Sequence, residues 1–467
     1  MVIFDSVKKE KVPFVPLHDK EVRIYVCGPT VYDDAHLGHA RSAIAFDLLR
    51  RTLEALGYRV IFTRNFTDID DKIINKSFET GEPIEAITEK YTQHYLRDME
   101  ALGVRDADIS PRATTSLDAI VEMIGKLLEN GCAYRSDDGT VWFDTSKDAD
   151  YCSLSHRCGD EEEVQARIAH EEGKRHPRDF ALWKACKEKD VCYDSPFGRG
   201  RPGWHIECSA MIDRYLAYHD EPYAIDIHGG GADLFFPHHE NEAAQTRCAT
   251  HRKLAKYWMH NGFVTIDGEK MSKSLGNSFF VKDALKVYDG EILRFYLLST
   301  HYRANFNFNE EDLLASKKRL DKLYRLKKRV YGVKAGQPDK DFHKAVLEAL
   351  SDDLNISRAL AAVDEMIAQA NEKLDADPKN KGLKQSVAAN ISWLDELLGI
   401  GVKDPFRYFQ LGLDEETIRR IETLIAERNE AKKAKDFRRA DAIRDELAAM
   451  GVQLMDTPAG TMWEKAE

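Results

Sequence analysis

The feature that most constrains the fold is a strand, loop, helix and strand in succession near the N-terminus. Residues 22–26 give a short apolar strand, and a loop rich in turn-forming residues follows it. Apolar side chains then recur at helical spacing over residues 40–56 and stop at Gly57, before a second strand, RVIFT, at residues 59–63. Two strands joined through a helix pair in parallel, so this unit predicts an α/β protein with a parallel sheet.

The α/β signal returns after residue 220, with a buried strand pattern at residues 223–227, a glycine-rich loop and a helix from about His238. A more irregular stretch separates the two halves. From about Glu310 the spacing of apolar residues becomes helical. We therefore predict a split Rossmann-like parallel-sheet catalytic domain with an insertion, followed by an α-helical C-terminal region. The expected units are residues 1–130 (first half), 131–203 (connective insertion), 204–309 (second half), 310–412 (helical bundle) and 413–467 (C-terminal region).

Charge and hydropathy restrict the possible partners. The net charge is -12, which argues against a protein coated in basic groups for nonspecific nucleic-acid binding. Mean hydropathy is -0.50, and no apolar run approaches the roughly 20 residues that a membrane helix needs. The N-terminal MVIFDSVKKE does not resemble a secretory signal. A cytoplasmic protein without a membrane partner is expected, with its 8 cysteines reduced.

A tetrapeptide, HLGH, stands between the first strand and its helix, at residues 36–39. The N-terminus of a helix presents unpaired N–H groups and the positive end of the dipole, which suit a phosphate. Gly38 lets a ligand approach the backbone closely, and His36 and His39 can donate hydrogen bonds to phosphate oxygens. The alternative is a polar loop in which both histidines are incidental.

A second motif, KMSKS, occupies residues 270–274 on an expected loop. Lys270 and Lys273 flank small hydroxyl side chains there. A mobile cationic loop can close over a triphosphate and neutralise charge as it develops. The alternative is a solvated surface loop.

Together these motifs resemble those of class I aminoacyl-tRNA synthetases. Closer resemblance, to the cysteinyl-tRNA synthetases, lies in residues 25–41, 64–73, 200–211, 226–242 and the final DTPAGTMW at 456–463. The resemblance covers nearly the whole chain. It implies a cysteine–tRNA ligase that uses ATP, with Mg²⁺, to form cysteinyl-adenylate and then transfers the cysteinyl group to the 3′ end of tRNA(Cys). A monomer is expected.

The same resemblance implies the site residues. One zinc ion per chain would be held by Cys27, Cys208, His238 and Glu242, and it would select cysteine over serine by binding the substrate thiolate. His36 and His39 would contact the phosphates, and Lys270 and Lys273 would stabilise the departing pyrophosphate. The remaining ATP contacts would be Gly38, Gly229, Gly230 and Gly231, and the substrate contacts would be Thr67, Trp204, His228 and Asp233. Trp204 could equally be an ordinary core residue.

The surface for tRNA is less constrained. Two basic stretches are candidates for phosphate contacts, and the alternative for each residue is a solvated helix face. They comprise Lys317, Lys318, Arg319, Lys322, Arg325, Lys327, Lys328 and Arg329, then Arg428, Lys432, Lys433, Lys435, Arg438, Arg439 and Arg444. Two rival functions are a cysteine ligase of mycothiol synthesis, which lacks an anticodon module, and a noncatalytic synthetase-like RNA-binding protein, which should have lost HLGH, KMSKS or the zinc ligands.

Four cysteines in the insertion fall outside the family pattern. Cys152 and Cys158 form one pair and Cys186 and Cys192 another, each separated by five residues. Two such pairs suggest a structural Cys₄ zinc site, with His156 as a substitute ligand. The spacing exceeds the usual two to four residues, so buried packing residues and disulfides are the alternatives.

Overall fold

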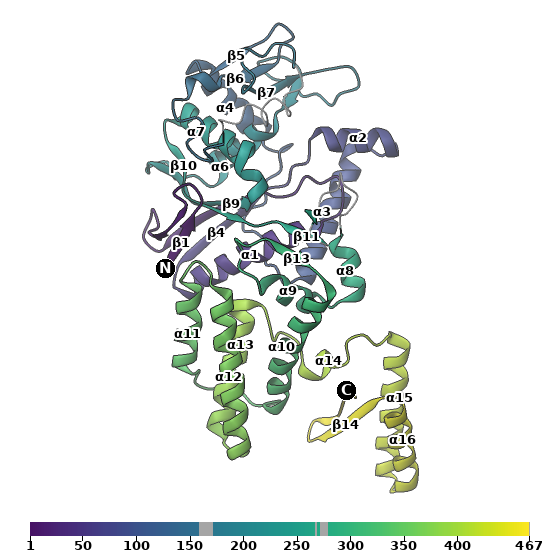
Figure 1. Cartoon of the computed structure of the whole chain (residues 1–467). Coiled ribbons are helices and arrows are strands. Elements are labelled where there is room, and N and C mark those ends of the chain that lie inside the picture. Colours follow the sequence, from purple (N-terminus) through teal and green to yellow (C-terminus); the bar gives the residue numbers. More distant parts are fainter. Residues whose placement is uncertain (158–170, 267–268, 271–278, 467) are drawn as a thin grey trace.

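A parallel sheet forms the centre of the molecule, as the strand–helix–strand pattern predicts (Figure 1). The computed structural model describes residues 1–157, 171–266, 269–270 and 279–466. Four strands lie in the order β10-β9-β3-β4, and each pairs in parallel with its neighbour. They are β3 (Glu21–Val26), β4 (Arg59–Arg64), β9 (Tyr223–Gly231) and β10 (Lys253–Asn261). The predicted α/β class is therefore confirmed.

Helices cover both faces of this sheet, which explains why its strands are apolar along their length. Side chains of α1 and α9 share one core with Ile24, Val26 and Phe62, and side chains of α6 and α7 share another with Tyr25 and Ile225. The helices of this part are α1 (Leu37–Ala55), α2 (Asp71–Thr80), α3 (Ile84–Ala101), α4 (Leu117–Glu129), α6 (Trp204–Tyr215), α7 (Glu240–Thr250), α8 (Val281–Val287) and α9 (Gly290–Leu298). Short strands flank the sheet: β1 (Val2–Asp5), β2 (Glu10–Pro13), β11 (Val264–Ile266), β12 (Glu269–Lys270) and β13 (Phe306–Phe308).

The insertion is an antiparallel sheet at one end of the molecule (Figure 1). Its strands are β5 (Ala133–Arg135), β6 (Val141–Phe143), β7 (Phe180–Ala185) and β8 (Gly200–Pro202). Cys186 and Cys192, in the loop between β7 and β8, form a disulfide. This bond removes two of the four thiolates that the suggested second zinc site would need, and Cys158 lies outside the described residues.

The C-terminal region is helical down to its last segment. Helices α10 (Glu310–Arg329), α11 (Lys340–Leu350), α12 (Ile356–Ala376), α13 (Lys381–Leu398), α14 (Pro405–Tyr408), α15 (Glu415–Lys433) and α16 (Phe437–Ala449) precede the hairpin β14 (Val452–Thr457) and β15 (Gly460–Lys465). The helical prediction misses this hairpin. It forms because Val452 and Trp463 pack against Ile443 and Leu447 of α16, in a small core separate from the main one.

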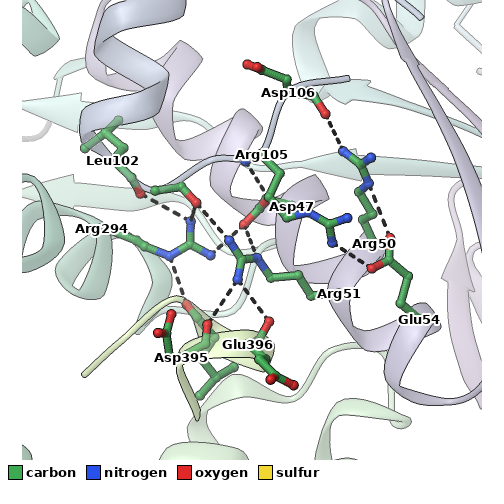
Figure 2. A network of polar contacts seen from close by, with 12 residues as sticks. Asp47, Arg50, Arg51, Glu54, Leu102, Arg105, Asp106, Arg294, Asp395 and Glu396 are labelled. Atoms are coloured by element: carbon green, nitrogen blue, oxygen red, sulfur yellow. Dashed lines mark hydrogen bonds and ion pairs between the residues drawn. The ribbon is translucent and has the colours of Figure 1, made fainter. Parts of the chain in front are cut away.

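A buried ion-pair network joins helix α1 to the bundle (Figure 2). The Asp47 carboxylate accepts hydrogen bonds from Arg294 at 2.6 Å and from Arg51 at 2.9 Å. The two guanidiniums also donate to the last carbonyls of α13, namely those of Asp395, Glu396 and Leu398. A helix leaves its final carbonyls without partners inside the helix, so these bonds satisfy them while fixing α13 to α1.

A second polar group fixes the loop before α1. Asp34 accepts hydrogen bonds from His94 of α3 at 2.7 Å and from Lys282 of α8 at 2.8 Å. Burial opposes ionisation of Asp34, but these two partners outweigh it and lower its pKa. Asp98, one turn further along α3, is also buried, and burial together with the charge of Asp34 raises its pKa to about 6.

Replacing Asp47 by Asn should destabilise the fold, because Arg294 is fully buried and would lose its only carboxylate among the described residues. The expected loss is about 3 kcal/mol in the free energy of unfolding, and salt should change it little. Chemical denaturation measures it. Glu54→Gln is the matched control on the same helix and should cost under about 1 kcal/mol. Glu54 is one-third exposed, its partner Arg105 is also partly exposed, and its other partner, the buried Arg50, keeps its ion pair with Asp108. Equal effects of both substitutions would contradict the assignment.

Asp98→Asn should stabilise the protein increasingly as the pH rises. Because the pKa of Asp98 is raised in the folded state, the native protein binds more protons than the unfolded chain between about pH 4 and 6, and Asp98 lowers stability above that window. Asp34, His94, Arg97 and Lys282 are the charged neighbours. The stabilisation should be about 1 kcal/mol greater at pH 8 than at pH 5. Exposed Glu100→Gln on the same helix is the control, and a pH-independent gain would refute the prediction.

Candidate active site

A cleft of about 640 Å³ opens at the carboxyl ends of the parallel strands. This is the edge at which open α/β sheets bind ligands. The walls come from the loop after β3, the first turns of α1, the end of β4, and the segments after β9 and β10. The lining side chains include Cys27, Thr30, Tyr32, His36, His39, Ser42, Arg64, Lys72, Tyr95, Trp204, Asp233 and Asn261.

The HLGH segment forms the start of α1, three residues earlier than the apolar spacing predicts. His36 is the N-cap, and its Nδ1 accepts hydrogen bonds from the backbone N–H groups of Gly38 at 3.0 Å and His39 at 3.4 Å. His39 Nδ1 accepts in return from the His36 N–H, so the two imidazoles act as a capping box and stack with centroids 3.8 Å apart. A Cβ on Gly38 would lie 2.8 Å from the His36 ring, so only glycine fits there.

Backbone hydrogen bonds tie this turn to the segment that follows KMSKS. The Leu37 N–H donates to the Phe279 carbonyl at 3.1 Å, and the Val281 N–H donates to the Ala35 carbonyl at 2.9 Å. Lys270 is the last residue of β12, which pairs with β11. Lys273 lies outside the described residues.

Four side chains that could ligate a metal ion converge beside the cleft, and they are the four that the family resemblance implies as ligands. Cys27 follows directly after β3, Cys208 lies on α6, His238 lies in the turn before α7, and Glu242 is on α7. Their ligand atoms all lie within 4.8 Å of one another. The Sγ atoms of Cys27 and Cys208 are 3.9 Å apart, and His238 Nε2 lies 3.4 Å from Glu242 Oε2.

The chemistry of this cluster fits a divalent cation. Burial raises the pKa of Cys27 and Glu242 and lowers that of His238, because a low-dielectric interior disfavours every isolated charge. His238 Nε2 is buried and has no hydrogen-bond partner among the described residues. A cation would balance the anionic forms and occupy that nitrogen. Two sulfurs, one imidazole and one carboxylate are a donor set that zinc prefers.

The structure also brings together a second possible set of metal ligands, which overlaps the first and which the sequence motif does not predict. Cys27 and Glu242 also lie within reach of His228 and His239. His239 Nε2 is 3.5 Å from Cys27 Sγ, and His228 Nε2 is 3.0 Å from Glu242 Oε1. Spacing alone therefore does not separate His238 from His239. Of these two, His238 is the one whose Nε2 has no hydrogen-bond partner among the described residues.

The predicted substrate residues divide into two groups. Trp204 and Asp233 line the cleft, and Trp204 stacks on His238 with centroids 3.9 Å apart and 38% of its surface exposed, so it is not a core residue. Thr67 and His228 are buried and do not line it. Thr67 instead exchanges backbone hydrogen bonds with the loop after β3.

The three glycines after His228 have different reasons to be glycine. Only Gly231 lines the cleft. A Cβ on Gly229 would lie 2.3 Å from the Phe46 ring, so this residue lets α1 pack against β9. A Cβ on Gly230 would meet Leu234 at 3.0 Å. Room for a nucleotide is therefore an explanation for Gly231 alone.

Most of the predicted basic stretches are paired with acids. Ion pairs join Lys317 to Asp321, Arg319 to Asp364, Lys328 to Glu464, Arg329 to Asp375, Arg428 and Lys432 to Asp456, Lys433 to Glu430, and Arg439 to Glu427. An RNA phosphate there would have to compete with these carboxylates. The pairing favours the alternative of solvated helix faces for these residues.

Among the described residues, every helix is too short or too polar to span a bilayer.

Comparison with known protein families assigns most of the chain. Residues 13–318 match the tRNA synthetases class I (C) catalytic domain, residues 345–403 the DALR domain, and residues 415–463 the cysteinyl-tRNA ligase anticodon binding domain. The cysteine–tRNA ligase of a Nitratiruptor species is 67% identical over 466 residues, covering 100% of both chains. That of Wolinella succinogenes is 64% identical over 465 residues, covering 99% of both.

Solved structures of lower sequence identity share the fold. Mycobacterium tuberculosis methionyl-tRNA synthetase bound by methionyl-adenylate matches 81% of this chain and 92% of its own, with a TM-score of 0.60 and 15% identity. The Agrobacterium radiobacter complex of LeuRS, tRNA and LeuAMS matches 81% and 84%, with a TM-score of 0.61 and 12% identity.

Proposed function

Because the chain belongs to the cysteinyl-tRNA synthetase family of class I synthetases, we propose that it charges tRNA(Cys) with cysteine and selects that amino acid through zinc. Its activity is that of a cysteine–tRNA ligase, with ATP as the second substrate. The observation that carries the zinc proposal is the convergence of Cys27, Cys208, His238 and Glu242 beside the cleft.

Zinc would provide the discrimination that shape cannot. Serine differs from cysteine by one atom, and pockets separate such near-isosteres by only ~100-fold. A zinc ion, when bound, favours a thiolate over a hydroxyl because the thiol ionises readily and the metal is borderline soft. Trp204, stacked on His238 at the cleft wall, would orient the amino acid next to the ligand cluster.

The first step would join the cysteine carboxylate to the α-phosphate of ATP. One carboxylate oxygen forms a bond to phosphorus while the bond from phosphorus to the bridging oxygen breaks, and pyrophosphate leaves. Mg²⁺, when bound with ATP, would neutralise part of the phosphate charge. The positive end of the α1 dipole and the His36 and His39 side chains would attract the phosphates, with Gly38 allowing close approach; the backbone N–H groups of residues 37–39 are already hydrogen-bonded within the protein. Lys270 and Lys273 would stabilise the leaving group, and Asp233 and Gly231 would border the nucleotide.

The second step would transfer the cysteinyl group from the adenylate to a ribose hydroxyl at the tRNA 3′ end, releasing AMP. Residues 413–467 would read the anticodon, since they contain a core of their own and match the anticodon binding domain. That match disfavours the mycothiol ligase, which lacks such a module. The other proposed units are residues 1–130 and 204–309 for catalysis, 131–203 for the insertion and 310–412 for the bundle. The monomeric state stays a prediction.

Cys208→Ser should lower the zinc content of the purified protein well below one ion per chain and reduce cysteine-dependent ATP–pyrophosphate exchange at least ~100-fold, because a hydroxyl is a poor zinc ligand. Metal analysis and exchange kinetics measure both effects. Cys248→Ser is the control: Cys248 is also buried, on α7, but lies outside the donor set. A parent protein that contains no metal and still rejects serine would disprove the zinc proposal.

Deleting residues 414–467 should leave cysteine-dependent pyrophosphate exchange within a few-fold of the parent but reduce tRNA(Cys) charging at least ~100-fold, the loss expected when a recognition surface is removed. None of the described side chains of this unit lines the cleft, whereas the family match assigns the unit to the anticodon. Both reactions are measured on the same preparations. A parallel loss of the two would mean that the unit stabilises the catalytic part.

A further inference from the structure

Arg64 is a buried cation on the cleft wall with no counter-ion among the described residues. It is the last residue of β4, its side chain lines the cleft, and only 6% of the residue surface is exposed. Its Nη2 is buried and has no hydrogen-bond partner in the described part of the chain. The guanidinium lies 5.0 Å from the Phe62 ring, which compensates only part of the charge.

Most other buried arginines of this protein are balanced by carboxylates. Arg294 pairs with Asp47, Arg201 with Asp190 and Asp71, and Arg428 with Asp456. Arg41 also lacks a carboxylate within the described ranges, but it donates to the His301 carbonyl and does not line the cleft. An unpaired buried charge is strongly unfavourable. Arg41 also has Nε and Nη1 without hydrogen-bond partners in the described part of the chain, so the distinguishing feature of Arg64 is its place on the cleft wall, where an anion from a ligand can balance it.

The register of the sheet places Arg64 opposite the metal-binding thiols. Arg64 lies beside Val26 in the register of β4 and β3, so both side chains project from the face of the sheet that α1 covers. Cys27, the next residue after β3, points to the other face, toward Cys208. Gly28 then leaves space for the arginine stem, since a Cβ there would lie 3.1 Å from Arg64 Cγ and 1.6 Å from the Asn65 carbonyl oxygen.

We propose that Arg64 binds the α-carboxylate of the substrate cysteine. The inference rests on the proposed function, which places the substrate thiolate at the Cys27 cluster. An amino acid held there must extend across the sheet edge for its carboxylate to reach a phosphate at the N-terminus of α1. Arg64 lies on that side of the edge. A guanidinium can hold a carboxylate through two parallel hydrogen bonds, and it offsets the repulsion between carboxylate and phosphate as they approach.

A substrate without the carboxylate tests the assignment. Cysteamine keeps the thiol and the amine of cysteine, so it should inhibit cysteine-dependent ATP–pyrophosphate exchange competitively. Arg64→Gln should raise the KM for cysteine about 10- to 100-fold, as expected for the loss of a charge-assisted pair, and change the inhibition constant of cysteamine less than about 3-fold. Arg64→Lys keeps the positive charge but loses the two parallel N–H donors of the guanidinium, so it should give an intermediate KM for cysteine.

Controls separate this proposal from the one it depends on. Arg59→Gln, at the exposed other end of β4, should change neither constant. Cys208→Ser should weaken cysteine and cysteamine together if the metal holds the thiol, and unchanged cysteamine binding there would refute the proposed function instead. Thermal unfolding shows that each variant is folded, and zinc content shows that the Arg64 and Arg59 variants keep the metal site. Should Arg64→Gln fail to fold, Arg64→Lys alone supports the inference if it weakens cysteine selectively.

Three results would overturn the assignment. The first is equal weakening of cysteine and cysteamine by the Arg64 variants, which would make Arg64 a general determinant of pocket shape. The second is an unchanged KM for cysteine in both variants. The third is unchanged ATP–pyrophosphate exchange together with slower transfer of the cysteinyl group to tRNA in single-turnover assays. That result would mean that Arg64 contacts a phosphate of the RNA 3′ end and not the carboxylate of cysteine.

Discussion

The Asp47 carboxylate, held between the guanidiniums of Arg294 and Arg51, is the interaction on which the arrangement of the molecule depends. Helix α1 begins with the HLGH cap at the cleft and carries Asp47 further along its length. The same guanidiniums bind the final carbonyls of α13, so one helix carries the HLGH cap at the cleft and anchors the bundle (Figure 2). The apolar core runs without interruption from β3 across α1 into α10–α13. Charge and packing thus fix the cleft relative to the bundle.

The sequence predicts the central sheet because parallel strands that are covered on both faces must be apolar throughout, and few other arrangements satisfy that pattern. It also predicts that His238 and Glu242 approach each other, since four residues are about one helical turn. Helix α1 starts earlier than apolar spacing indicates because its cap is made by imidazoles, which are uncommon N-caps. The disulfide between Cys186 and Cys192 depends on a turn that spacing does not specify.

Local patterns do not predict roles that depend on contacts distant in sequence; the family resemblance names Cys27 and Cys208 together, but it does not give the packing roles that the structure shows for Gly229 and His228. Residue 229 must be glycine because the Phe46 ring of α1 packs against it. The His228 side chain is held by its hydrogen bond to Glu242. Arg64 ends an apolar strand, and its position at the carboxyl end of a parallel strand is the one local signal that could have pointed to it. In sequence the basic helices resemble RNA-binding surfaces. In the structure many of their basic side chains pair with carboxylates, often from other elements, which the sequence pattern does not reveal.

The separate core of the last two helices and hairpin has an evolutionary consequence. Ile443, Leu447 and Trp463 pack among themselves and, within the described ranges, share no apolar cluster with the catalytic sheet. A substitution that repacks this small core need not disturb the geometry around Cys27 or the start of α1. Selection can therefore adjust which RNA is recognised while the choice of amino acid stays constant, and the two halves of decoding can drift at independent rates.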